Sequence, residues 1–182
     1  RRARWRAAAW SASEGGSLRV ALWPRQGPAW QLSVGCLQAS GGEDLPRQLE
    51  AMGEHLEPPA VLCGSFGAPP QEVHEALRRA GLTGYRSAHR EVLGEELPWT
   101  AVGGRGGLGD GACQSSDGIW LSGGSSPLAP LAALSGHARG PWKDSHGQPC
   151  SKNLPTDHLA LVVAFEHARP SDSISLLQLQ DL

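Results

Sequence analysis

The residues best suited to catalysis lie in the stretch LPTDHLALVVAFE, residues 154–166. There Asp157 and His158 come directly before an apolar run. A carboxylate that holds one ring nitrogen of a histidine fixes the tautomer and orientation of the ring. Such a histidine can contact a phosphate or transfer a proton. A histidine at the edge of a strand is, however, more often packed or solvated than catalytic. The pair alone leaves a catalytic site and an ordinary polar turn both open.

Apolar patterns predict the strands that would position these residues. We expect strands at 17–23, 29–39, 60–64, 117–122 and 158–165, the first two joined as a hairpin through a glycine-proline turn. The segments 82–116 and 123–153 are rich in glycine and are expected to be mostly irregular. The run GGRGGLGDG at 103–111 has no P-loop lysine after it and is interpreted as a loop insertion.

Two helices are predicted between these strands. The first follows Gly41-Gly42, with Asp44 as its cap and Pro46 in its first turn. Its apolar face is formed by residues at helical spacing, namely Leu45, Leu49, Met52 and Leu56. The second helix covers QEVHEALRRAG, residues 71–81, with acidic residues early and arginines late, as the helix dipole favours.

Composition indicates one globular domain. Of the 182 residues, 40% are hydrophobic and 19% are charged, and the 24 glycines and 14 prolines favour many turns. A net charge of -2 argues against a protein that coats nucleic acid but is compatible with a nuclease that has acidic metal ligands. The four cysteines show no Cys-x-x-Cys spacing, which disfavours a zinc site. Two of them, Cys36 and Cys63, lie in strand-like runs, which suggests a reducing compartment but leaves disulfides open.

Three segments, in this order, resemble motifs of the endonuclease/exonuclease/phosphatase superfamily. PAVLCGSFGAPP at 59–70 is similar to the strand that ends in Gly-Asp-Phe-Asn, SDGIWLS at 116–122 to the Asp-Tyr-Ile-Trp strand, and LPTDHLALVVAFE to the Ser-Asp-His strand. Two further segments, LSVGCLQA at 32–39 and LPWTAV at 97–102, resemble its Thr-His-Leu and Pro-Tyr-Thr segments. The branch that looks most similar is the deadenylase-like one, with nocturnin, the angel proteins and the carbon catabolite repressor deadenylases. The resemblance covers roughly residues 17–166.

The resemblance implies an α+β fold: the C-terminal half of a four-layer α/β sandwich, with mostly antiparallel sheets flanked by helices. It implies a magnesium-dependent phosphodiesterase, an RNA 3′-exonuclease directed at poly(A), in which Mg²⁺ neutralises charge on the phosphate. Asp117 would orient His158, His158 would contact the scissile phosphate, and Asp157 would lie beside the metal. Asp117 and His158 can meet if their two strands are neighbours in the sheet.

Several positions depart from the family pattern. Gly-Asp-Phe-Asn is Gly64-Ser65-Phe66-Gly67 here, so Ser65 replaces the carboxylate that activates water and Gly67 replaces the asparagine that helps to hold metal and phosphate. The histidine of Thr-His-Leu is Cys36, and the tyrosine of Asp-Tyr-Ile-Trp is Gly118. A serine hydroxyl cannot replace a carboxylate base at neutral pH. These departures predict a degenerate active site.

The domain organisation follows from the same comparison. Residues 17–166 are interpreted as the C-terminal half of the domain, and residues 167–182 as a tail. Residues 1–16 are a basic segment. Its arginines could belong to a transit peptide or contact nucleic acid. We expect instead that the segment is a frayed, internal start of a longer chain. The counterparts of the family's early metal ligands are not found before residue 17, and we expect them upstream.

Three functional hypotheses remain open at this point. The chain is an intracellular, cytoplasmic magnesium-dependent phosphodiesterase acting on RNA or another phosphodiester. Alternatively it is a pseudoenzyme that binds RNA or a protein through the same fold, for which the surplus of tryptophans (seven, against one tyrosine and two phenylalanines) offers stacking residues. In the third hypothesis the resemblance is misleading and the chain is an unrelated α/β domain.

Overall fold

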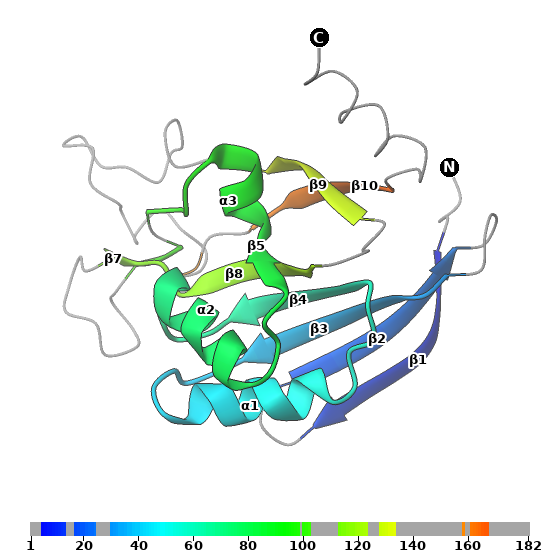
Figure 1. Cartoon of the computed structure of the whole chain (residues 1–182), viewed down its shortest axis with the longest axis horizontal. Helices are drawn as coiled ribbons and strands as arrows, with labels where there is room; N and C mark the ends of the chain where they lie inside the picture. The colour runs from blue at the N-terminus through cyan, green and yellow to red at the C-terminus, as the bar shows by residue number, and fades with distance from the viewer. Residues whose placement is uncertain are drawn as a thin grey trace, which may run out of the picture.

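The chain is described from a computed structural model, which covers residues 5–13, 17–24, 30–98, 100–102, 113–123, 128–133, 158 and 161–167. Its elements, in chain order, are β1 (Trp5–Ser13), β2 (Ser17–Pro24), β3 (Leu32–Gln38), α1 (Asp44–Gly53), β4 (Ala60–Ser65), α2 (Pro70–Arg79), β5 (Tyr85–Ser87), α3 (Ala88–Leu93), β6 (Ala101–Val102), β7 (Cys113–Gln114), β8 (Asp117–Ser122), β9 (Leu128–Ala133) and β10 (Val163–His167). The expected α+β class is therefore found (Figure 1).

The main sheet has six described strands in the order β1-β2-β3-β4-β8-β5. Every neighbouring pair in it is antiparallel except β3 and β4, which are parallel. The strands β9 and β10 form a separate antiparallel pair, and so do β6 and β7. The sheets are thus mostly antiparallel, as expected. The four-layer arrangement stays a prediction.

Helices α1 and α2 cover one face of the main sheet (Figure 1). The apolar repeat predicted for α1 is confirmed, because Leu45, Leu49 and Met52 are all buried. They pack in one cluster with Leu62 of β4 and Trp120 of β8. Each fully buried leucine contributes roughly 1.5–3 kcal/mol through the hydrophobic effect, so this helix–sheet interface holds the central strands in place.

The opposite face of β4 and β8 has a second, smaller cluster. Val61 of β4 and Leu121 of β8 are Cα partners on this face, and both are buried with Leu128 of β9. Phe165 of β10 packs against the same cluster. The β9–β10 pair therefore packs on this face of the sheet, against β4 and β8.

The amino-terminal segment differs from the expectation of a frayed end. Residues 5–13 form β1, which pairs antiparallel with β2 from Trp5↔Pro24 to Ser13↔Ser17. Without β1, the outer edge of β2 would present a row of unpaired backbone N–H and C=O groups. The alanine-rich composition of this segment gives little β-strand signal, which is why the sequence did not indicate it.

The segments expected to be irregular contain further elements. β5, α3, β6 and β7 lie within 82–116, and β9 lies within 123–153. The prediction of mostly irregular structure was wrong for these residues. α3 begins after Ser87, whose hydroxyl accepts from the backbone N–H of Arg90, an N-cap bond that stabilises a helix by about 1 kcal/mol.

Two element boundaries also need correction. Asp44 is the first residue of α1 and not its cap; Glu43 occupies the cap position and makes no side-chain capping bond. The strand expected at 158–165 begins later, at Val163, and pairs with β9 instead of joining β4 and β8. His158 is connected differently, through an isolated antiparallel bridge to Ala101. None of the three described helices has the length and apolar character needed to cross a membrane.

Candidate active site

The candidate site is built around the carboxylate of Asp117. Asp117 is the first residue of β8, and its Cα partner on the neighbouring strand is Ser65, the last residue of β4. The backbone N–H of Phe66 donates to the carbonyl of Ser116 at 2.7 Å and closes this end of the β4–β8 pair. Only 12% of the Asp117 side chain is exposed, so its carboxylate interacts in a partly desolvated environment.

His158 lies directly against Asp117. Its Nδ1 is 3.0 Å from both Oδ1 and Oδ2 of Asp117. A carboxylate can only accept hydrogen bonds, so Nδ1 carries the proton and donates it to Asp117. The lone pair of the neutral ring is then on Nε2, and 40% of the His158 side chain is exposed. This orientation suits a histidine that accepts a proton or, once protonated, donates to an anionic oxygen.

Thr100 holds Asp117 from the other side. Its hydroxyl donates to Oδ2 of Asp117 at 2.7 Å and accepts from the backbone N–H groups of Ser116 and Asp117, both at 2.9 Å. Thr100 is fully buried, with 0% of its surface exposed. The Ser116 hydroxyl adds a longer bond of 3.3 Å to Oδ2. Because Ala101 forms the bridge to His158, one short segment positions both members of the Asp117–His158 pair.

The other predicted positions are placed as follows. Ser65 is buried beside Asp117, and Gln38 of β3 is the Cα partner of Ser65 on its far side. Cys36 is exposed and lies two residues before Gln38 on the same strand. Gly67 has a φ of 61°, and a Cβ atom there would lie 2.8 Å from the backbone nitrogen of Gly41. Asp157, the predicted metal neighbour, lies outside the described residues.

The described residues alone do not fit a magnesium ion. They include no group of three or more histidine, cysteine, aspartate or glutamate side chains that could hold a metal. The carboxylate present at the site, Asp117, already accepts from Thr100, Ser116 and His158. Mg²⁺ requires an octahedron of oxygen ligands that these groups do not supply. Magnesium therefore stays a prediction, resting on Asp157, and no chemical step is assigned to it.

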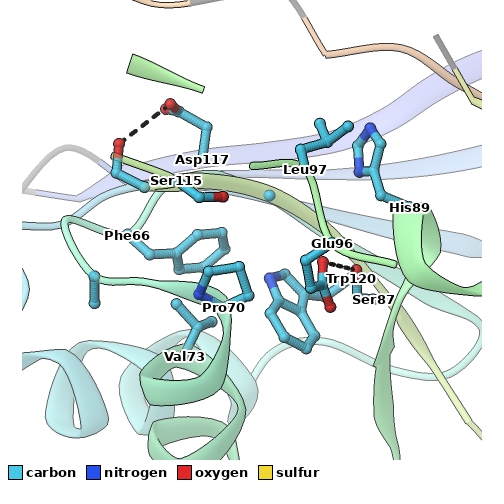
Figure 2. A pocket seen from close by; sticks show the side chains of 13 residues that line it. Phe66, Pro70, Val73, Ser87, His89, Glu96, Leu97, Ser115, Asp117 and Trp120 are labelled. Atoms are coloured by element: carbon cyan, nitrogen blue, oxygen red, sulfur yellow. Dashed lines mark hydrogen bonds between the residues drawn. The ribbon is translucent and has the colours of Figure 1, made fainter. Parts of the chain in front are cut away.

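On the far side of β8 from the Asp117 carboxylate, aromatic rings fill the fold. Figure 2 shows the rings of Phe66 and Trp120 below the strand while Asp117 points away from them. Their centroids are 6.5 Å apart in an edge-to-face arrangement, and both residues are buried. A Cβ atom at Gly118 would lie 2.8 Å from Nε1 of Trp120, so the family's tyrosine does not fit there unless the indole moves. Trp120 is thus a packing residue.

Solved structures of the endonuclease/exonuclease/phosphatase superfamily are similar to this fold. The human nocturnin catalytic domain matches with a TM-score of 0.55 and 20% identity, over 91% of this chain and 60% of that one. ANGEL2, a 2′,3′-cyclic phosphatase, matches with a TM-score of 0.57 and 14% identity, over 89% and 67%. The endonuclease/exonuclease/phosphatase from Bacteroides vulgatus matches with a TM-score of 0.55 and 11% identity, over 90% and 67%. No protein-family model and no curated protein sequence matches the chain.

These similarities decide the fold. The chain has part of the endonuclease/exonuclease/phosphatase fold. It spans 60% of the length of the nocturnin catalytic domain, so the described strands and helices correspond to a portion of that superfamily's domain. Identities of 20% and below show the fold and leave the reaction, the substrate and the deadenylase-like branch as proposals.

Within this fold, sequence reasoning missed the residue that supports Asp117. Thr100 lies in LPWTAV, a segment noted only for its similarity to Pro-Tyr-Thr of the endonuclease/exonuclease/phosphatase superfamily. Threonine is not a residue type that by itself indicates catalysis. The role of Thr100 depends on its contact with Asp117, which lies 17 residues later in the chain. The signal that could have identified Thr100 is the resemblance of its segment to Pro-Tyr-Thr. A residue that matches such a motif is a candidate for positioning Asp117.

Proposed function

We propose that this chain is the phosphate-contacting part of a phosphodiesterase of the RNA 3′-exonuclease, deadenylase-like type, with a degenerate active site. The observation that carries the proposal is the contact of His158 Nδ1 with both carboxylate oxygens of Asp117, each at 3.0 Å. This contact orients the imidazole, and 40% of the His158 side chain is exposed. Similarity to the nocturnin and ANGEL2 folds supports a phosphorylated substrate, and we expect RNA.

The proposed reaction is hydrolysis of a phosphodiester by water. His158 would contact a non-bridging oxygen of the phosphate and, when protonated, donate a hydrogen bond to it as negative charge develops. Asp117 would stabilise the protonated ring, because the carboxylate is held in place by Thr100 and Ser116. Magnesium is assigned no step here, because its predicted neighbour Asp157 lies outside the described residues.

The serine at position 65 predicts a slow reaction. It occupies the position beside Asp117 where the resemblance implies a carboxylate base, and a general base contributes typically about 10²–10⁴-fold to a rate. We therefore expect RNA to bind to this chain and to be cleaved slowly. The second candidate function, an RNA-binding module without catalysis, is supported by the same substitution together with Gly67.

The test is a paired binding and cleavage measurement on a labelled RNA that ends in poly(A), with Mg²⁺ present. His158→Ala should weaken binding by about tenfold, the effect of losing one charge-assisted hydrogen bond. His55→Ala is the matched control, because His55 is exposed and precedes β4, at the opposite end of that strand from Ser65. It should leave binding unchanged.

The outcomes separate the two functions. Magnesium-dependent cleavage that His158→Ala removes and His55→Ala keeps supports the phosphodiesterase. Binding that depends on His158 without any cleavage supports the binding module. Equal binding by all three proteins, with no cleavage, would refute both, since neither function would then involve the Asp117–His158 pair.

A further inference from the structure

Two thiols face one another on the strands next to the candidate site. Cys36 of β3 and Cys63 of β4 are Cα partners in the parallel pairing of these strands. Both are reduced; Cys36 is exposed, while Cys63 is partly buried and its thiol donates to the carbonyl of Gly35 at 3.4 Å. That bond directs the sulfur of Cys63 toward the strand that carries Cys36.

The thiols lie on the same face as the site. The residues Gln38, Ser65 and Asp117 are successive Cα partners across β3, β4 and β8. Cys36 comes two residues before Gln38, and Cys63 comes two residues before Ser65. Side chains two residues apart on a strand share a face and lie about 7 Å apart, so both thiols are on the face of the site. A group attached to the exposed Cys36 would lie beside Ser65 and Asp117.

We propose that Cys36 and Cys63 are a reactive dithiol that closes to a disulfide in the presence of a low-molecular-weight disulfide such as oxidised glutathione. The thiolate of Cys36 attacks one sulfur of the reagent, forms a mixed disulfide and releases one glutathione thiolate. The thiolate of Cys63 then attacks the Cys36 sulfur, forms the Cys36–Cys63 bond and releases the second glutathione thiolate. The two cysteines lose two protons and two electrons, and the reagent is reduced to two thiols.

The order of attack follows from exposure. Cys36 is the thiol that a reagent in solution reaches, whereas burial raises the pKa of Cys63 to about 12, with neighbouring Cys36 adding to the increase. Cys63 is therefore a poor partner for reagents in bulk solution and a resolving thiol for its neighbour. Once Cys36 is in a mixed disulfide it carries no charge, so its contribution to the raised pKa of Cys63 is removed.

The backbone permits the bond. Neighbouring strands are about 4.8 Å apart, within the range of about 4.4–6.8 Å between the Cα atoms of disulfide-bonded cysteines. Cys36 and Cys63 are directly paired across β3 and β4, and the bond from Cys63 to the carbonyl of Gly35 places its sulfur next to residue 36. Closure would replace a bulky adduct at Cys36 with a compact bond and leave the face beside Ser65 clear.

The experiment treats the full chain with oxidised glutathione and maps disulfides by peptide mass spectrometry. Wild type should give a peptide pair that joins Cys36 to Cys63, with the loss of two hydrogens and no lasting glutathione adduct. The Cys63→Ser variant lacks the resolving thiol, so it should accumulate glutathione on Cys36, and this adduct should persist about tenfold longer than in wild type. Cys36→Ser should form neither product at these two positions.

Two results would overturn the proposal. One is a stable Cys36 adduct in wild type that decays no faster than in Cys63→Ser. The other is a mapped disulfide that joins Cys36 or Cys63 to Cys113 or Cys150 instead of to each other. Mapping under native conditions, before any unfolding step, ensures that the bond reports the folded pairing of β3 and β4.

Discussion

Replacing Thr100 with valine tests whether the buried hydroxyl holds the candidate site together. Thr100→Val preserves the shape of the side chain and removes only its three hydrogen bonds. The hydroxyl donates to Asp117 and accepts from the backbone N–H groups of Ser116 and Asp117. Because Thr100 is fully buried, water cannot replace these bonds without entering the core.

The expected loss can be worked from these contacts. Each buried backbone N–H left without an acceptor costs about 1–3 kcal/mol, and a hydrogen bond to a charged group is worth about 1.5–3 kcal/mol. Asp117 keeps His158 and Ser116 as donors, which offsets part of the third loss. We therefore expect Thr100→Val to lower the free energy of unfolding by about 3 kcal/mol.

The assay is urea unfolding, with Thr100→Ser as the matched control. Serine keeps the hydroxyl and loses one buried methyl group, which costs about 1 kcal/mol. RNA binding should follow the same order, with Thr100→Val weaker than Thr100→Ser, because the carboxylate that orients His158 loses its buried support. A valine variant as stable as the serine variant would refute the assignment of Thr100 as the residue that positions Asp117.

Two further predictions concern charge in buried positions. Ser65→Asp places a second carboxylate opposite Asp117, so it should lower the free energy of unfolding by about 1–2 kcal/mol relative to Ser65→Asn at neutral pH. This difference in stability should disappear near pH 4, where carboxylates become protonated. Equal stability of the two variants at neutral pH would contradict the prediction. Burial raises the pKa of Tyr85 from 10.0 to about 12, and its hydroxyl has no partner among the described residues. The folded state therefore disfavours the phenolate, and unfolding by urea should become easier as pH rises from about 10 through 12. The effect should be smaller in Tyr85→Phe, where Cys63 is the described residue whose raised pKa still contributes over this range. Parallel pH profiles of wild type and Tyr85→Phe would show that Tyr85 is not buried as described.

The central elements were predictable because their sequence signals are strong. α1 has a complete apolar repeat, and the run at 60–64 and the segment 117–122 form β4 and β8, which are neighbours in the sheet. The contact of Asp117 with His158, which the resemblance implied, is present at 3.0 Å, although the strands expected to bring it about are not neighbours in the sheet. The roles of the two residues in catalysis stay a prediction.

The connection that brings His158 to Asp117 was not predictable from the pattern. The run HLALVVAF has the composition of a buried strand, but composition does not say which strand it pairs with. Among the described residues of this region, the structure places Val163–His167 in a strand, beside β9. β9 itself, LAPLAA, contains a proline and three alanines, which are poor strand formers, so it gave no signal.

The positions that depart from the family pattern are not equivalent, and this bears on function. Ser65 ends β4 as the Cα partner of Asp117, so the departure from the resembled motif at this position lies in the side chain. Gly67, by contrast, packs so closely that a Cβ atom would lie 2.8 Å from the backbone nitrogen of Gly41. An asparagine could adopt the φ of 61° but not this contact, unless residues 39–41 moved. The backbone around Gly67 therefore does not accommodate an asparagine as it stands, whereas Asp117 accepts hydrogen bonds from both Thr100 and His158. This difference supports the proposal that the chain contacts phosphate more effectively than it activates water.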